Sequence, residues 1–222
     1  MTSLPFQNNT NFGVGPLSGT QNILNIEPVI PIALNKDWTV ITRTILPLTW
    51  QPGFTPGAGT DFGLGDLQLS AFLSPSAGGL IWGAGVTTQM PTDMNDLGNK
   101  NWELGPTAVI LKREKSSPWV YGTLINNVWS LTSNQRGGSY NNFLLQPFIN
   151  YNLPGGTYIN TMPIITANFK ADSGQQWTVP LGLGVGKIFH FGKLPVNAQL
   201  AGYYNVVKPD DGPNWQRGCR CS

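Results

Sequence analysis

A glycine-rich stretch that ends in lysine, from Gln176 to Lys187, has the residue types closest to phosphate-binding chemistry. A P-loop needs glycine, four residues, a second glycine, lysine and then serine or threonine, because its N–H groups, ammonium and hydroxyl surround phosphates and Mg²⁺. Here Leu181 stands where the first glycine is required, and Ile188 follows the lysine. The sequence QWTVPLGLGVGK therefore does not predict a nucleotide site.

Nucleophilic and metal chemistry have few residues available. His190 is the single histidine, so a histidine-rich metal site is excluded. We expect it in a short turn, and no Ser/His/Asp arrangement is recoverable around it. Cys219 and Cys221 form a C-x-C pair, which is a poor disulfide candidate and half a metal site. We expect no enzyme activity, no metal and no cofactor; a membrane-embedded lipid hydrolase is the alternative.

Read with a period of two, the same glycine-rich stretch is regular. Strict alternation of large and small residues is typical of a strand whose two faces meet different surroundings. The large residues are Trp177, Val179, Leu181, Leu183 and Val185, and the others are Thr178, Pro180, Gly182, Gly184 and Gly186.

Similar segments recur along the whole chain. Most span about 10 to 13 residues, which matches the ~9–11 tilted residues that cross the hydrocarbon of a bilayer. We expect strands near 3–12, 21–33, 38–50, 63–73, 80–90, 102–111, 118–130, 142–152, 157–169, 177–188 and 195–206, with a stub from Trp215. Brief connections alternate with longer ones, as in outer-membrane barrels, although the contrast is modest at 13–20 and 170–176.

Tryptophan marks the ends of the apolar faces. In 38–50 the even residues are apolar or threonine, with Trp38 and Trp50 at the two ends. This pattern predicts a lipid-facing strand, because indole rings favour the two headgroup interfaces. The expected interface aromatics are Trp38, Trp50, Trp82, Trp102 and Trp177. The faces of 118–130 stay ambiguous, because Asn126 and Asn127 are adjacent, and inward Ile41, Ile45, Val109 and Leu111 imply a partly apolar lumen.

Four charged residues fall on the inward faces: Glu27, Arg43, Asp66 and Glu103. If residues 35–37 form a three-residue turn, Arg43 lies opposite Val29 and diagonal to Glu27. We predict that Glu27 and Arg43 pair, because a charge at membrane depth requires a partner. Each of the four is either a lumen residue that meets solutes, or a structural ion pair or rim charge.

Composition favours a membrane barrel over other classes. Only 11% of the residues are charged, against ~25% in ordinary soluble domains. The net charge of +2 argues against a nucleic-acid partner, and no run of 18 apolar residues predicts a membrane-spanning helix. A secreted, soluble, glycine-rich β protein is the alternative and would bury the tryptophans.

Several motifs carry a family resemblance. They include LPFQNNTNFGVG at 4–15, LNIEPVIPIAL at 24–34, FGLGDLQLSAFLSP at 62–75, LQPFINY at 145–151 and DGPNWQ at 211–216. With these, the chain resembles the bacterial outer-membrane family labelled "MetA-pathway of phenol degradation", up to about Gln216. The resemblance implies a roughly twelve-stranded barrel that acts as a transporter in a Gram-negative outer membrane, and it supplies no catalytic residues.

Two departures from that family concern the ends of the chain. No export signal precedes the first strand, so we expect a fragment or a late start, and WQRGCRCS stands where a final strand should end. We therefore expect residues 1–214 to form one barrel domain and 215–222 to be an aberrant or truncated tail. Strands 3–12 and 195–206 would then not be bridged, at a cost of several kcal/mol for each backbone group left facing lipid.

Together these observations predict an all-β, antiparallel, up-and-down transmembrane barrel of about 12 strands with a truncated last strand. The expected function is passage of small molecules, aromatic or hydrophobic ones among them. The expected partners are the lipid bilayer, small solutes and, for the full-length form, the barrel-assembly machinery. A structural or adhesive barrel is the alternative function.

Overall fold

The computed structural model describes residues 2–76, 80–92, 97–98, 101–113, 116–131, 139–192 and 194–222. Within them, strands dominate and one short 3₁₀ turn, η1 (Pro154–Gly156), is present. No helix in these ranges is long and apolar enough to span a membrane. The strands are β1 (Phe6–Val14), β2 (Gly19–Ile26), β3 (Val29–Ala33), β4 (Trp38–Gln51), β5 (Asp61–Leu64), β6 (Leu67–Pro75), β7 (Leu80–Met90), β8 (Glu103–Arg113), β9 (Trp119–Ser130), β10 (Asn141–Asn152), β11 (Thr157–Thr161), β12 (Ile165–Asn168), β13 (Trp177–Phe191), β14 (Leu194–Val207) and β15 (Trp215–Cys221).

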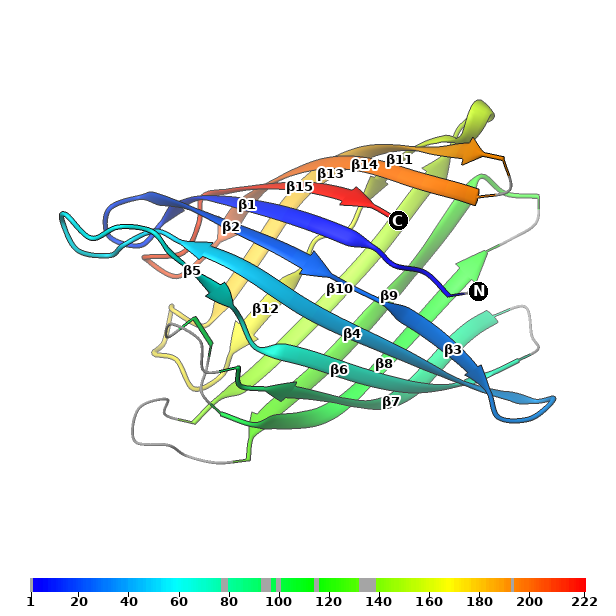
Figure 1. Ribbon diagram of the computed structural model, residues 1–222, viewed down its shortest axis with the longest axis horizontal. Helices are drawn as coiled ribbons and strands as arrows, with labels where there is room; N and C mark the ends of the chain where they lie inside the picture. Colours follow the sequence, from blue (N-terminus) through cyan, green and yellow to red (C-terminus); the bar gives the residue numbers. More distant parts are fainter. Residues whose placement is uncertain are drawn as a thin grey trace.

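These segments form one antiparallel sheet that closes on itself (Figure 1). Each segment pairs with its sequence neighbours, β9 pairs with β10, and β1 pairs with β15, which closes the circuit. The result is a closed barrel of 12 strands, because β2 with β3, β5 with β6 and β11 with β12 are interrupted halves of single strands. The expected fold class is confirmed.

The prediction that the first and eleventh strands cannot be bridged is wrong. Strand β15 pairs on one side with β1, from Phe6↔Cys221 to Phe12↔Trp215, and on the other side with β14. Beyond it, Ser222 and Asn197 exchange two backbone hydrogen bonds, of 3.0 and 2.7 Å. The tail is short, but its backbone satisfies the open edges of both neighbours.

The interruptions in three strands occur at prolines or where the register shifts. Between β5 and β6 the pairing with β4 shifts by one residue, from Leu48↔Leu64 to Ile45↔Gln68. Pro28 separates β2 from β3, and it has no N–H to give to the ladder. Residues 162–164 separate β11 from β12; the flanking pairs place Pro163 opposite Pro147 of β10, and Ile164 opposite Pro180 of β13. The wall of the barrel is therefore poor in ladder hydrogen bonds around Met162 and Ile164.

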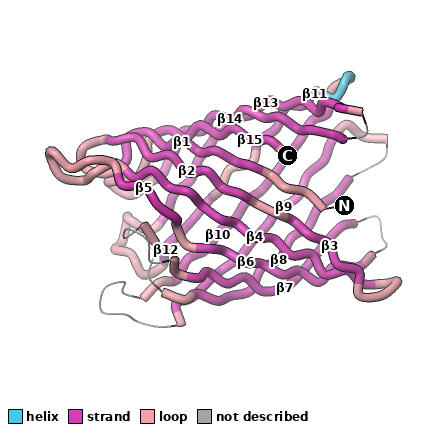
Figure 2. Tube along the Cα trace, in the orientation of Figure 1, coloured by secondary structure: helices cyan, strands magenta, loops and turns pink. Residues whose placement is uncertain are grey.

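Connections of different length gather at the two ends of the barrel (Figure 2). The turn end, which also carries the two termini, has the connections 34–37, 76–79, 114–118, 153–156 and 192–193. The loop end has 15–18, 52–60, 91–102, 131–140, 169–176 and 208–214. The expected contrast holds except at 15–18; parts of the connections 76–79, 91–102, 114–118, 131–140 and 192–193 lie outside the described residues.

The first turn has the predicted register. The backbone N–H of Leu34 donates to the carbonyl of Trp38 at 3.0 Å, and the side chain of Asn35 accepts from the N–H groups of Asp37 and Trp38. This short loop sets the pairing of β3 with β4, including Val29↔Arg43.

Glycines on the inner face of β13 make room for aromatic side chains from neighbouring strands. A Cβ at Gly186 would overlap the ring of Tyr158, and one at Gly182 would meet Tyr203. Both tyrosines are buried, and the Tyr158 hydroxyl donates to Asn197 at 2.8 Å. The glycine face of 176–187 therefore carries tyrosine rings from β11 and β14 instead of facing open water.

Candidate functional site

The lumen is lined by the residues that alternation along each strand places inward. A cavity of about 230 Å³ lies inside the barrel, with polar and charged residues on part of its surface and apolar residues on the rest. The polar lining is Gln7, Asn25, Glu27, Arg43, Gln68, Ser70, Thr107, Asn126, Gln146 and Arg220. The apolar lining is Ile45, Leu124, Leu144, Phe148, Met162 and Ile164.

Glu27 is held at the junction of β2 and β3 and points into this cavity. Its N–H donates to the carbonyl of Pro5 at 2.8 Å, and Pro28 fixes the chain direction after it. The side chain is only 2% exposed. A carboxylate so deeply buried requires partners that carry positive charge.

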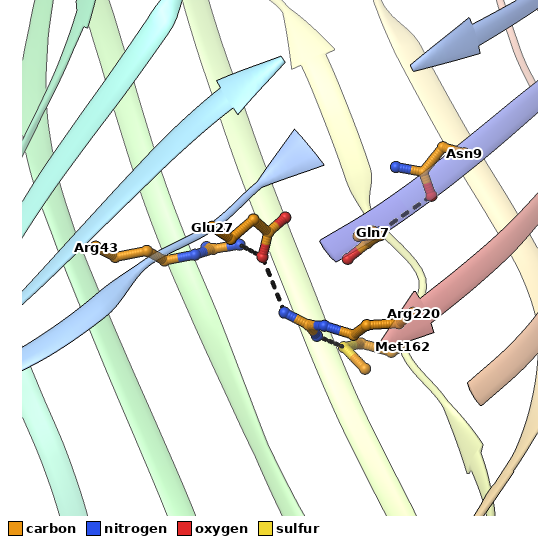
Figure 3. A network of polar contacts seen from close by, with 6 residues as sticks. All are labelled: Gln7, Asn9, Glu27, Arg43, Met162 and Arg220. Atoms are coloured by element: carbon orange, nitrogen blue, oxygen red, sulfur yellow. Dashed lines mark hydrogen bonds and ion pairs between the residues drawn. The ribbon is translucent and has the colours of Figure 1, made fainter. Parts of the chain in front are cut away.

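Two arginines supply that charge, and both contact the same oxygen (Figure 3). The Nη2 of Arg43 lies 3.0 Å from Oε2 of Glu27, and the Nη2 of Arg220 lies 2.9 Å from it. Arg43 comes from β4, and its position opposite Val29 is the one that the turn at 35–37 predicted. The predicted pair of Glu27 and Arg43 is therefore present.

Arg220 was not identified from the sequence. It comes from β15, the segment expected to be a tail. In the structure Gln216 and Arg220 line interior cavities. Arg217 is exposed and points to the opposite face. Because each face of WQRGCRC carries an arginine, no polar–apolar alternation marks Arg220 in the sequence.

Asp66 and Glu103 form a second acidic group, toward the loop end. Both side chains are buried, and Gln89 links their surroundings: its Nε2 donates to Oδ2 of Asp66 at 3.2 Å, and its backbone pairs with that of Glu103. A Cβ at Gly98 would overlap the Asp66 carboxylate, so the connection 91–102 packs against it. The four candidate charges thus divide into two groups, and of these four only Glu27 and Arg43 line the 230 Å³ cavity.

The apolar part of the cavity lies across the barrel from the arginines. Leu124 comes from β9, Leu144 and Phe148 from β10, and Met162 and Ile164 from the interruption between β11 and β12. That interruption is held by the Met162 N–H, which donates to the Tyr203 hydroxyl at 3.0 Å. Arg220 also contacts this wall, because its Nη1 lies 4.0 Å from the sulfur of Met162.

The inward isoleucine that implied a partly apolar lumen, Ile45, lines this cavity. The ambiguous strand 118–130 is also resolved. The buried and lumen-lining residues Leu124, Asn126 and Val128 face inward, so Asn127 faces outward, where it donates to Asn141 at 2.9 Å. The adjacent asparagines therefore occupy opposite faces.

The predicted interface aromatics lie on the outer wall near the strand ends. Trp38 and Trp82 meet edge to face at the turn end, with ring centroids 6.3 Å apart. Trp50, Trp102 and Trp177 stand at the loop end, each exposed. Three further tryptophans extend the two belts: Trp119 at the turn end, and Trp129 and Trp215 at the loop end.

Cationic side chains also project from the outer wall. Lys187 of β13 lies with its Nζ 5.5 Å from the ring centre of Phe189, beside a shallow hollow of about 670 Å³. This hollow is lined largely by outward residues, including Phe6, Leu200 and Cys221. It is therefore a depression in the outer surface, separate from the lumen.

The residues first considered for catalysis are not brought together. His190 ends up in an exposed position near the turn end of β13, and Cys219 and Cys221 are free thiols on β15. Across the described ranges, no group of three or more His, Cys, Asp or Glu residues could hold a metal ion. The arrangement in the lumen offers charged groups, amides and an apolar wall.

Comparison with known proteins shows which solved structures share this fold. No family model matches the chain, and no curated protein matches it in sequence. Among solved structures, the COG4313 outer-membrane channel from Pseudomonas putida F1 has a TM-score of 0.72 at 19% identity, over 99% of this chain and 92% of that one. The NanC porin has a TM-score of 0.61 at 9% identity, over 99% and 97%. The chain therefore has the barrel fold of outer-membrane channels and porins.

Proposed function

We propose that this protein is an outer-membrane channel that lets small solutes pass through its lumen. The observation that carries the proposal is the closed barrel with opposite surfaces: an apolar outer wall with tryptophan at both ends, and a polar lumen that contains a cavity. Closure leaves no free sheet edge in such a barrel, as hydrocarbon demands. Both structural neighbours are named as a channel and a porin, which supports the same role.

The solutes are small. Twelve strands lie between filled 8-stranded barrels and open 16-stranded porins. A cavity of about 230 Å³ is below the ~300–1,000 Å³ of sites for drug-sized ligands. The apolar wall from β9 to β12 supports hydrophobic or aromatic solutes as well as polar ones. The bilayer and the barrel-assembly machinery are the partners that this proposal implies.

Ser70 and Ala71 provide a matched test. These neighbours on β6 point to opposite faces: Ser70 lines the lumen cavity, and Ala71 lies on the outer face with Leu69 and Leu73. The protein is reconstituted in planar bilayers and in liposomes, and conductance in KCl and swelling with small sugars and aromatic acids are measured. We expect Ser70→Trp to reduce both, because the indole fills the cavity, and Ala71→Trp to leave both unchanged.

Folding is checked by heat-modifiable migration in detergent gels, which closed barrels show. A folded wild-type protein that neither conducts nor swells liposomes contradicts the channel and favours a structural or adhesive barrel. Equal conductance in the two tryptophan variants would also contradict it, because permeation would then not follow this lumen.

A further inference from the structure

We propose that the lumen cavity binds small amphipathic organic anions, a carboxylate attached to a short apolar body, between the two arginines and the facing apolar wall. The inference rests on the proposed function, since a ligand reaches this site through the lumen, and it names the class of solute.

The first argument is the charge balance at Glu27. The Glu27 carboxylate pairs with two guanidinium groups, Arg43 and Arg220, through one oxygen. The three side chains together therefore carry a net charge of +1. Glu27 is 2% exposed and each arginine is 24% exposed, so the accessible part of the group is cationic. Positive charge in a cavity with walls of low dielectric constant attracts anions more strongly than it does in open water.

The second argument is the unused hydrogen-bonding capacity of the arginines. Among the described residues, Arg43 makes a single hydrogen bond, to Glu27. Arg220 donates to Glu27 and to the sulfur of Met162, which is a weak acceptor; its Nε has no partner in the protein but is buried, so its Nη N–H groups are the ones open to a ligand. A guanidinium has five N–H donors in a planar fork, which suits the two oxygens of a carboxylate.

The third argument is the apolar wall opposite. Leu124, Leu144, Phe148 and Ile164 line the same 230 Å³ cavity as both arginines. An inorganic anion would make no apolar contact with this wall, and a neutral hydrocarbon would make no hydrogen bond or ion pair with the arginines. A molecule that uses both has a charged head and an apolar body of one ring or a short chain.

The test uses three probes on the purified full chain in detergent, with dissociation constants from titration calorimetry. Benzoate has both parts, acetate has the charge alone, and benzyl alcohol has the ring alone. We expect benzoate to bind at least about tenfold more tightly than either, because each part adds to the binding free energy. Equal affinity for benzoate and benzyl alcohol, or for benzoate and acetate, overturns the proposal.

Variants then locate the binding. Arg220→Gln and Phe148→Ala should each weaken benzoate binding about tenfold, and the first should leave benzyl alcohol unaffected. Arg217→Gln is the matched control, because Arg217 lies on the same strand and points out of the barrel. Should Arg220→Gln not fold, Arg43→Gln replaces it. Unchanged benzoate affinity in both the arginine and the Phe148 variants places the binding elsewhere and refutes the site.

Conductance of the same preparations separates the two proposals. A protein that conducts ions but does not prefer benzoate keeps the channel and loses the anion site. A protein that binds benzoate through Arg220 but does not conduct keeps the site and loses the channel.

Discussion

Replacing Glu27 by glutamine removes the one carboxylate that two arginines share, and we expect a large loss of stability. A hydrogen bond to a charged group contributes about 1.5–3 kcal/mol. Glu27 accepts two of them, at 3.0 and 2.9 Å, from guanidinium groups that are each 24% exposed. Solvent screening favours the lower value, so Glu27→Gln should cost about 3 kcal/mol of the free energy of unfolding.

The loss should exceed that of either arginine alone. Arg43→Gln leaves Glu27 paired with Arg220 and should cost about 1.5 kcal/mol. Arg217→Gln, on the outer face, should change the free energy of unfolding by less than about 0.5 kcal/mol. The assay is urea unfolding in phospholipid vesicles, followed by tryptophan fluorescence, with heat-modifiable migration as the check of folding. A Glu27→Gln variant no less stable than Arg43→Gln would refute the shared-carboxylate reasoning.

Three further predictions concern the wall. Gly186→Val should lower the free energy of unfolding by about 1–3 kcal/mol, because the new side chain would meet the Tyr158 ring. Gly202→Val should be tolerated, because the space around its Cβ is open. Equal urea midpoints for the two variants would contradict this packing. Deletion of 215–222 should abolish heat-modifiable migration, because β1 and β14 lose their shared neighbour; a deletion variant that still migrates as a closed barrel would show that β15 is dispensable. Brominated phospholipids should quench most of the tryptophan fluorescence, because seven of the eight indoles are exposed on the outer wall; quenching by aqueous acrylamide alone would contradict that placement.

The local sequence pattern was sufficient to predict most of the strands that form the barrel wall. Alternation predicted which residues of 38–50 face outward, because neighbours along a strand must meet hydrocarbon and lumen in turn. The turn at 35–37 also predicted a long-range fact, the pairing of Glu27 with Arg43, because a short loop fixes the register of the strands that it joins.

The rest depends on contacts that no local pattern contains. Arg220 and Glu27 are 193 residues apart, so their contact follows from closure of the barrel and from nothing near either residue. The segment 215–222 also shows no polar–apolar alternation, because Arg217 and Arg220 lie on opposite faces. Pro163 interrupts a strand, and the contact of the Met162 N–H with the Tyr203 hydroxyl at this break is a long-range fact that alternation does not contain.

Because β1 is the first strand of the chain and β15 the last, one edge of β1 has no partner until the barrel closes. Without β15, a sheet of the other strands has two free edges, which are templates for association with other chains. Seven cross-strand pairs between β1 and β15 help to turn that sheet into a cylinder. Closure is thus a non-local event of the kind that slows folding and leaves time for misassembly.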